Sequence, residues 1–292
     1  MPRRALLLFV TLGVIWGIPY LLIKVAVTEM DPAFVVFIRV ALGAAVLMPI
    51  VLARRQLHLL RGRWRWVLAF ALTEITFTFL ALTWAEERIS SSLAALLVAS
   101  VPTVGTVLAW RFGLDAHITR TRIAGLALGF LGVGCLVGFD VSGGTALAVA
   151  AVGVTVLGYA MGPIIIEKRL SDVPSLPVIA VSLAINSVIY LPFGIAAWPT
   201  KGASATAWTS VVVLGVLCTA LAFVALFALI GEVGAPRAQV ITYINPAVAV
   251  VLGVAVLSEP VTLGLAIGFP LVLLGSWLGT RSGPVLEAEP HP

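Results

Sequence analysis

The sequence predicts an all-α membrane protein with ten transmembrane helices, arranged as two inverted five-helix repeats with both termini in the cytoplasm. Three observations support this prediction: the composition, a succession of long apolar segments, and a set of motifs that recurs in the second half. Of the 292 residues, 61% are hydrophobic and only 11% are charged, and the mean hydropathy is +1.13. A soluble domain has about 25% charged residues, and it cannot bury so much apolar side chain. The composition therefore indicates a chain that lies mostly within a lipid bilayer.

Ten segments are long and apolar enough to cross the hydrocarbon, which takes about 20 residues in a helix. The first half contributes Ala5–Val27, Pro32–Ala53, Trp66–Trp84, Ser90–Trp110 and Ile123–Phe139. The second half contributes Ala146–Ile166, Leu176–Trp198, Trp208–Ile230, Ala238–Leu257 and Thr262–Gly279. The first segment follows two arginines, as the core of a signal peptide does. It is long enough to span, however, and further spans follow it, so we expect an uncleaved helix.

The basic residues set the predicted orientation, because short cytoplasmic loops carry an excess of Lys and Arg. With the N-terminus inside, fourteen of the eighteen Lys and Arg residues fall on the cytoplasmic side. Arg88 and Lys201 then face outward, while Lys24 and Arg39 lie within spans. This distribution predicts cytoplasmic termini, a short cytoplasmic tail over residues 282–292, and a multi-pass protein of the cell membrane.

The two halves of the chain repeat each other. Pro246 follows Pro102, and Pro163 follows Pro19, by the same 144 positions. We therefore expect one five-helix repeat over residues 5–140 and a second over residues 146–281. Because five is odd, the second repeat must enter the membrane inverted. Inverted repeats are common in secondary transporters, whose substrate site lies near the midplane at the repeat interface.

The four matched prolines, Pro19, Pro102, Pro163 and Pro246, lie within predicted spans. A proline in a helix interior removes a backbone hydrogen bond and costs roughly 3 kcal/mol. Within a membrane, neighbouring helices, hydroxyl groups or water can satisfy the freed carbonyl. The prolines are either structural kinks or kinks that line a substrate cavity. Their matched positions in both repeats favour the cavity.

Three ionisable side chains lie within the predicted spans, each at a cost of roughly 2.5–3.5 kcal/mol on insertion scales. Glu74 is either a neutral carboxyl hydrogen-bonded within the bundle or a group that binds protons or substrate. Arg39 is expected to pair with a carboxylate, either Glu74 or one near Glu29–Asp31, or else to hold a substrate anion. Lys24 either extends to the outer interface or lies at the external mouth of a cavity.

Aromatic and amide side chains complete the candidate site. Trp16, Tyr20 and Lys24 are spaced four apart and share one face of the first helix. Such a stripe is more polar than a lipid-facing surface and indicates cavity lining, although Trp and Tyr also form belts at membrane interfaces. The remaining candidates for the substrate or coupling site lie in the second half: Tyr159, Tyr243 and Asn245.

Other residues are expected to serve structure. Asn186 suits an interhelical hydrogen bond, and Glu259 suits a turn or cap ahead of the last span, although it is also a candidate for a gate. Glycines along the fifth and tenth spans indicate close helix packing, within the protein or against a second copy, so the chain is a monomer or a homodimer. These glycines are Gly125, Gly129, Gly132, Gly264, Gly268 and Gly275.

Several stretches together resemble the EamA-type branch of the drug/metabolite transporter superfamily, whose members carry two tandem copies of a five-helix unit. They are "GVIWGIPYLLIK", the arginine in "FVVFIRVALGAAVL", and "ALIGEVGAPRAQVITYINPAVAVVLGVAVLSEPVTLGLAIGFPLVLLGSWL". The last stretch combines a mid-span proline, a Glu at a short turn and a glycine-spaced final helix. Asp115 stands where the family usually has Glu in the first copy. The resemblance implies a secondary transporter of small metabolites or drugs in the cytoplasmic membrane, typically an exporter.

We therefore expect an exporter of amino-acid-like or other small polar compounds that works by alternating access. A metabolite uptake permease is the alternative, and a non-transporting scaffold is a weaker one. The sequence has no P-loop, so an ion gradient, such as that of protons, or the substrate gradient must supply the drive. The predicted spans hold no Ser–His pair or carboxylate cluster, so we expect no enzyme, metal or cofactor. The net charge of +5 falls between apolar spans rather than on a soluble face, which argues against a nucleic-acid partner.

Overall fold

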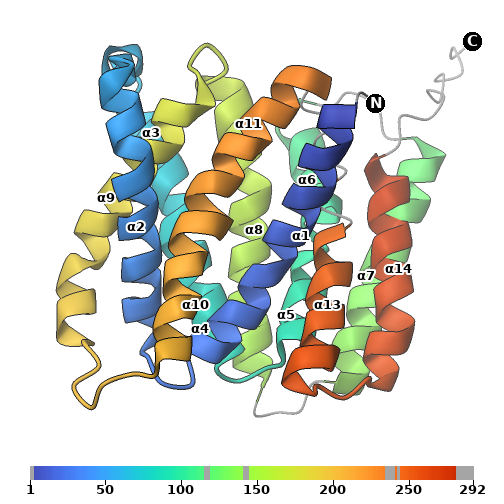
Figure 1. Ribbon diagram of the computed structural model, residues 1–292. Coiled ribbons are helices and arrows are strands. Elements are labelled where there is room, and N and C mark those ends of the chain that lie inside the picture. Colours follow the sequence, from blue (N-terminus) through green and yellow to red (C-terminus); the bar gives the residue numbers. More distant parts are fainter. Residues whose placement is uncertain (1–2, 115–118, 141–144, 234–240, 242–243, 281–292) are drawn as a thin grey trace, which may run out of the picture.

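The computed structural model describes residues 3–114, 119–140, 145–233, 241 and 244–280. Within these residues every regular element is a helix, and the helices lie side by side with their ends gathered at two opposite faces (Figure 1). Eight helical segments of the described residues are long and apolar enough to cross a membrane, and two shorter apolar helices accompany them; three of the eight, Trp64–Glu86, Ser91–Arg111 and Ala205–Val233, are each made of consecutive shorter elements. The predicted all-α membrane protein is confirmed.

The first half of the chain folds into α1 (Arg3–Ala26), α2 (Pro32–Ala53), α3 (Trp64–Phe70), α4 (Phe77–Glu86), α5 (Ser91–Val98), α6 (Val101–Arg111) and α7 (Arg120–Asp140). A 3-10 helix, η1 (Gln56–Leu60), precedes α3, and a π-helix, η2 (Ala71–Thr76), joins α3 to α4. The third span therefore runs on to Glu86, two residues past its predicted end at Trp84.

The second half folds into α8 (Ala146–Arg169), α9 (Ser175–Ala196), α10 (Ala205–Gly215), α11 (Ala222–Val233), α13 (Ile244–Leu257) and α14 (Leu263–Thr280). A π-helix, η3 (Val216–Leu221), joins α10 to α11. Of the predicted span Ala238–Leu257, the described part is Ile241 and α13. Tyr243, Asp115 and the tail over residues 282–292 lie outside the described residues.

The two π-helices occupy matching places in the two halves. In each, a threonine hydroxyl donates to the carbonyl five residues earlier: Thr76 to Ala71 at 3.2 Å and Thr219 to Leu214 at 2.8 Å. Single-turn π-helices inside α-helices are rare and often lie at functional sites. The third span of each half therefore departs from regular α-helical geometry near its middle.

Side chains next to the helix starts explain where several helices begin. Asp31 has extended backbone angles and its carboxylate accepts from the N–H of Ala33 at 2.8 Å, directly before Pro32. Ser90 and Ser204 cap α5 and α10 in the same manner, through the N–H groups three residues on. Such caps satisfy donors that have no partner within the helix.

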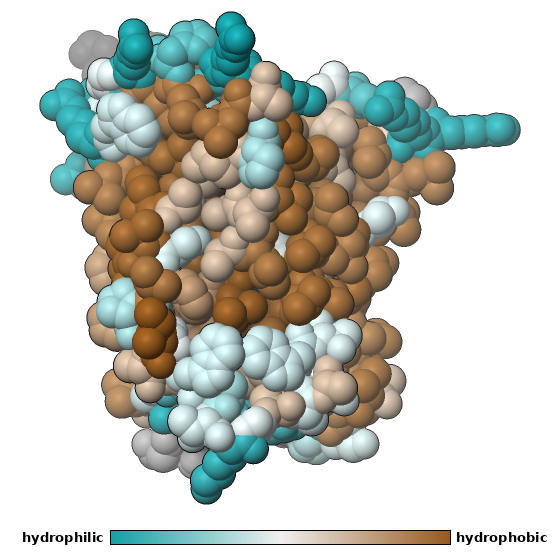
Figure 2. All heavy atoms as spheres, turned by 60° about the vertical axis from the view of Figure 1, so that its left-hand side comes forward, coloured by the Kyte–Doolittle hydropathy of each residue, from teal (hydrophilic) through white to brown (hydrophobic). Residues whose placement is uncertain are grey.

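We call the two ends of the bundle the Arg3 end and the Lys24 end, after residues near the two ends of α1; the Arg3 end is at the top of Figure 1. The faces between the two ends are apolar. Large hydrophobic side chains point outward there, with Val188 71% and Leu147 69% exposed. Figure 2 shows a hydrophobic band between two hydrophilic ends. A soluble monomer rarely exposes a patch of this size, so the band suits contact with lipid.

The helices α7 and α14 pack backbone to backbone, which confirms the close packing predicted from their glycines. A side-chain carbon at Gly132 would meet the backbone of Val272, and one at Gly275 would meet the backbone of Gly129. Next to this seam, the Ser276 hydroxyl donates to the Ala99 carbonyl at 2.9 Å. Small residues permit this close approach of helices in membranes.

Candidate functional site

The arginine predicted to bind a carboxylate lies at the junction of several helices. Arg39 of α2 is 7% exposed, its Nε donates to the Thr219 hydroxyl at 3.0 Å, and its guanidinium lies 3.9 Å from the ring centroid of Phe79. It makes no ion pair with any residue that the structure describes. The predicted pairing with Glu74, or with Glu29–Asp31, is therefore wrong. The buried cation is instead held by a hydroxyl and an aromatic face, as cation–π contacts allow.

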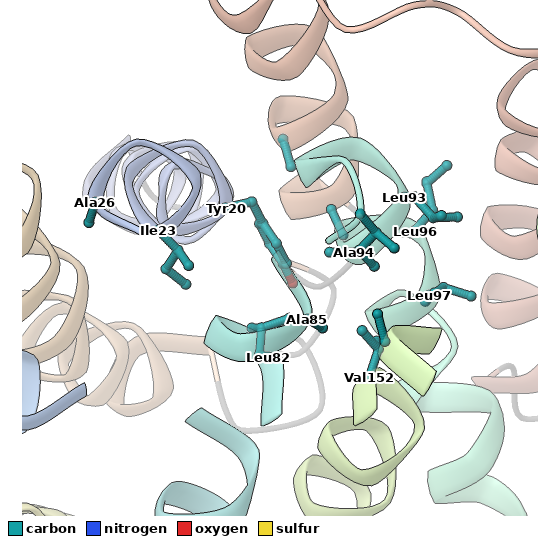
Figure 3. Close-up of a cluster of buried hydrophobic side chains, with 14 of the residues drawn as sticks. Tyr20, Ile23, Ala26, Leu82, Ala85, Leu93, Ala94, Leu96, Leu97 and Val152 are labelled. Carbon is teal, nitrogen blue, oxygen red and sulfur yellow. The ribbon is translucent and has the colours of Figure 1, made fainter. Parts of the chain in front are cut away.

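Tyrosines from two other helices lie around this arginine. Tyr20 of α1 and Tyr159 of α8 both interact electrostatically with Arg39. Tyr20 is 8% exposed, and its ring fills the space between α1, α4 and α5, close to Ala85 (Figure 3). Trp16, on the same stripe of α1 as Tyr20, packs edge-on against Phe223 with ring centroids 6.1 Å apart. The centre of the bundle is thus lined by Arg39 and aromatic side chains, which are packed together in this structure.

Glu74 lies within the π-helix η2 and faces α8, apart from the arginine. Its carboxyl group meets Gly162, where any side chain would overlap it. The Oε2 atom is buried and makes no hydrogen bond within the described residues. Gly162 therefore provides the space for this carboxyl group, but the hydrogen bond that the structural interpretation expects is not made by Oε2 within the described residues.

The predicted kink residues take two different positions. Pro102 is the second residue of α6 and Pro246 is the third of α13, whereas Pro19 and Pro163 lie inside α1 and α8. In the first turn of a helix the missing N–H has no intrahelical partner to lose, so the proline costs little. Span four is accordingly broken into α5 and α6 rather than bent, and Pro163 lies on an exposed surface of α8.

Asn245 connects two helices that pack closely. In the amide orientation that satisfies its hydrogen bonds, its nitrogen donates to the Gly13 carbonyl at 3.1 Å and the Ile241 carbonyl at 3.0 Å. Gly13 and Gly17 of α1 leave room for α13, because a side chain at either position would meet Ile244 or Val248. The partly buried amide of Asn245 is therefore satisfied by α1 and by Ile241, and Asn245 joins the two halves of the chain.

Lys24 lies at the end of α1 and ties down the end of α4. Its ammonium donates to the carbonyls of Glu86 at 2.6 Å and Ile89 at 2.9 Å. Cations bind favourably to carbonyls at helix C-termini. Lys24 is partly buried, so it does not extend freely to the interface; instead it closes the Lys24 end of the bundle over Tyr20.

Glu259 closes the same end from the other half of the chain. Its carboxylate accepts from the N–H groups of Ser91 at 2.7 Å and Ser92 at 3.0 Å. Glu259 lies in the turn ahead of α14, as predicted, but the helix that it caps is α5 rather than α14. The prediction that Glu259 caps a helix was correct, but the predicted helix was wrong. Only the tertiary fold brings the turn after α13 against the start of α5.

Asn186 has the structural role that the sequence predicts. Its nitrogen donates to the Ser182 carbonyl at 2.8 Å and to the Ala71 carbonyl at 3.3 Å, and its oxygen accepts from the Thr76 hydroxyl at 2.6 Å. Tyr190 also donates to the Thr76 carbonyl at 2.6 Å. Two of these bonds, to the carbonyls of Ala71 and Thr76, attach α9 to the π-helix η2.

Glu86 is the residue at this site that sequence reasoning missed. It lies in "AEERIS", which reads as a polar loop, yet it is the last residue of α4 and is 0% exposed. Its carboxyl group interacts electrostatically with Lys24, Glu259 and Arg39. In the sequence, two glutamates followed by an arginine look like a solvent-exposed loop. Glu86 is buried, and Glu87 exposed, only because the helix continues past Trp84.

A contact at each end joins matching positions of the two halves. At the Lys24 end, Glu29 accepts from the Ser204 N–H and from its hydroxyl, both at 2.7 Å. At the Arg3 end, Asp172 accepts from Arg63 at 2.6 Å. Asp172 is the counterpart of Glu29, since each follows the first helix of its half, and Arg63 and Ser204 are the N-cap residues of α3 and α10.

We expect the Glu29–Ser204 contact to weaken in acid. Hydrogen bonds from the side chain and backbone of Ser204 hold the pKa of Glu29 below its ordinary value of 4.5. A lowered folded-state pKa stabilises the fold above the ordinary value, and this contribution is lost as the pH falls through the folded-state pKa. Thermal unfolding of the purified protein across this acid range should show the loss in wild type but not in Glu29→Gln. The exposed Glu167→Gln should behave as wild type; equal acid sensitivity in Glu29→Gln would contradict the contact.

Comparison with known proteins matches the whole architecture. The EamA-like transporter family matches residues 3–138 and again residues 146–281. The chain belongs to the EamA-like transporter family. It is therefore a multi-pass membrane transporter of the drug/metabolite transporter superfamily, located in the cell membrane.

Relatives and solved structures are similar over nearly the full length of this family member. An uncharacterized transporter of Bacillus subtilis, YvbV, is 28% identical, with 92% of this chain and 89% of that protein covered. An uncharacterized transporter of Archaeoglobus fulgidus is 24% identical, with 91% and 95% covered. One crystal structure of a protein has a TM-score of 0.69 at 20% identity and covers 96% of this chain and 98% of that chain. The structural similarity shows a shared fold.

Proposed function

We propose that this EamA-like transporter exports amino-acid-like or other small polar compounds that carry a carboxylate, by alternating access. The observation that carries the proposal is the buried Arg39, which has no carboxylate partner within the described residues. A buried charge without a counter-ion is costly, and a substrate carboxylate would supply that counter-ion. The planar guanidinium is suited to binding a carboxylate through two hydrogen bonds.

The surrounding side chains suit a small amphipathic substrate. Phe79 lies against the face of the Arg39 guanidinium, and Tyr20 and Tyr159 lie around it. Aromatic rings and phenolic hydroxyl groups therefore surround the guanidinium. Thr219, from the π-helix of the other half, fixes the position of the guanidinium. Small-molecule sites in proteins are mainly apolar, with a few precisely placed polar groups. The aromatic surroundings of Arg39, with one guanidinium and several hydroxyl groups, have the same composition.

We further propose ten transmembrane helices in two inverted repeats, with both termini in the cytoplasm. The matched contacts Glu29–Ser204 and Asp172–Arg63 support the inversion, since equivalent positions meet at opposite ends of the bundle. The matched π-helices η2 and η3 support the duplication. The excess of Lys and Arg near the Arg3 end supports its cytoplasmic location.

The contacts at the two ends suggest which end is closed. At the Lys24 end, the bonds of Lys24 and Glu259 are partly buried. At the Arg3 end, the arginine of each ion pair, Arg4–Glu232 and Arg63–Asp172, is exposed, and exposed pairs contribute little. We infer that this conformation is closed to the outside, and that alternating access breaks the contacts at the Lys24 end.

A matched substrate panel tests the proposal. Cells expressing wild type, Arg39→Gln or no transporter would be loaded with labelled amino acids, the amines that lack only their carboxylate, and nucleobases. We expect wild-type cells alone to lose carboxylate-bearing compounds, while the amines are retained. Equal loss of the acid and its matching amine would contradict the role of Arg39. Faster accumulation of the acids by wild-type cells would indicate the uptake alternative.

A further inference from the structure

The carboxyl group of Glu86 is buried at the Lys24 end without a hydrogen-bond partner. The residue is 0% exposed, and neither Oε1 nor Oε2 makes a hydrogen bond with any described residue. An ionised carboxylate in such a place costs several kcal/mol, whereas a neutral carboxylic acid costs far less. In this conformation Glu86 is therefore best described as carrying a proton.

Lys24 is close to Glu86 but does not pair with its carboxyl group. Its ammonium donates instead to the main-chain carbonyls of Glu86 and Ile89. Charged or titratable groups from several elements lie within electrostatic range of one another and of the Glu86 carboxyl, while α5 contributes none. These groups are Lys24 and Tyr20 on α1, Arg39 on α2, Tyr159 on α8, and Glu259 after α13.

Opening the Lys24 end would change the surroundings of Glu86. The bonds of Lys24 to the end of α4 would break, and water would reach the carboxyl group. An ionised Glu86 would then be hydrated, and the released ammonium of Lys24 would be free to pair with it. Protonation therefore favours the closed conformation, because only the neutral acid tolerates burial without a partner.

We propose that Glu86 is a proton-binding site, and that its protonation stabilises the conformation closed at the Lys24 end. This inference rests on the proposed alternating access and adds the coupling ion to it. The other candidate, Glu74, lies in η2 against Gly162, and one of its oxygens is without a partner. Glu74 has no described hydrogen bond or ion pair to the contacts that close the Lys24 end, so its protonation has no direct route to them.

A cysteine reporter beneath the closed end tests the proposal without a substrate. Ala94 of α5 is fully buried and lies across from the Tyr20 ring (Figure 3). Ala94→Cys would be introduced with both native cysteines, Cys135 and Cys218, replaced by alanine. Right-side-out and inverted membrane vesicles would then be treated with a membrane-impermeant maleimide between about pH 6 and pH 8.5. The labelling rate is corrected for the pH dependence of the maleimide reaction itself, which is measured on the variant Lys201→Cys at an exposed position.

The labelling rate should depend on Glu86 and not on its neighbour. In right-side-out vesicles we expect the corrected rate to rise roughly tenfold from low to high pH, as the open state gains population. Glu86→Gln, which mimics the protonated acid, should hold the rate at its low-pH value throughout. Glu87→Gln is the matched control, because Glu87 is the exposed next residue and pairs with Arg88. It should keep the wild-type pH profile.

Two results would overturn the proposal. One is a wild-type rate that does not change with pH; the other is a pH profile abolished by Glu74→Gln and retained in Glu86→Gln. If Glu86→Gln does not reach the membrane, Glu86→Asp decides, since it should shift the midpoint of the profile, and an unchanged midpoint would contradict the role of Glu86. A wild-type labelling rate that does not change with pH, together with intact, Arg39-dependent transport, would refute the proton site alone and leave the proposed function standing.

Discussion

Arg39→Gln is expected to lower the transport rate of carboxylate-bearing substrates by roughly 100-fold, while the protein still reaches the membrane. The glutamine keeps a polar group near Thr219 but removes the charge that would bind the carboxylate. The buried position of Arg39 makes this loss large, because water cannot replace the missing charge within a packed bundle. Counterflow of the best substrate of the panel in proteoliposomes measures the rate directly.

Two further substitutions separate charge from geometry. Arg39→Lys keeps the charge but loses the planar fork and the Nε bond to Thr219, so we expect a rate between those of wild type and Arg39→Gln. Thr219→Val leaves the charge in place and removes one hydrogen bond, which should cost about tenfold or less. A transport rate in Arg39→Gln equal to that of wild type would show that Arg39 is a structural residue.

Gly275→Ala is expected to destabilise the folded protein by about 1–3 kcal/mol and to lower its melting temperature by several degrees. A side-chain carbon at this position would overlap the backbone of Gly129, and backbone atoms cannot move aside as a flexible side chain does. The helices α7 and α14 would have to separate along their whole seam. Thermal unfolding of the detergent-solubilised protein, followed by size-exclusion chromatography, measures the shift.

Gly134→Ala is the matched control for this prediction. Gly134 lies on α7 as well, but a side-chain carbon there would meet no atom within 4 Å. Alanine favours a helix over glycine by about 1 kcal/mol, so this variant should be as stable as wild type or slightly more stable. Equal melting temperatures for Gly275→Ala and Gly134→Ala would contradict the backbone contact between α7 and α14.

Local chemistry predicted several roles in the site correctly but not their partners. The capping role of Glu259 follows from a carboxylate at a turn, yet its partner is α5, far away in sequence. Arg39 was predicted to need a partner, and its described partners are Thr219 and Phe79 rather than a carboxylate. Asn186 was predicted with the correct chemistry because a buried amide must be hydrogen-bonded wherever it lies.

The sequence by itself determined the membrane class, the helical structure, the duplication and the transporter family. These properties follow from composition, segment length and repeated spacing. Each of these features involves many residues, so none of them depends on a single contact. The tertiary structure alone decided that Arg39 lies among Tyr20, Tyr159 and Thr219, and that Glu86 lies inside while Glu87 lies outside. Such placements depend on which helices meet and on where a helix ends to within one turn, and a single extra turn moves a carboxyl group from water into the bundle.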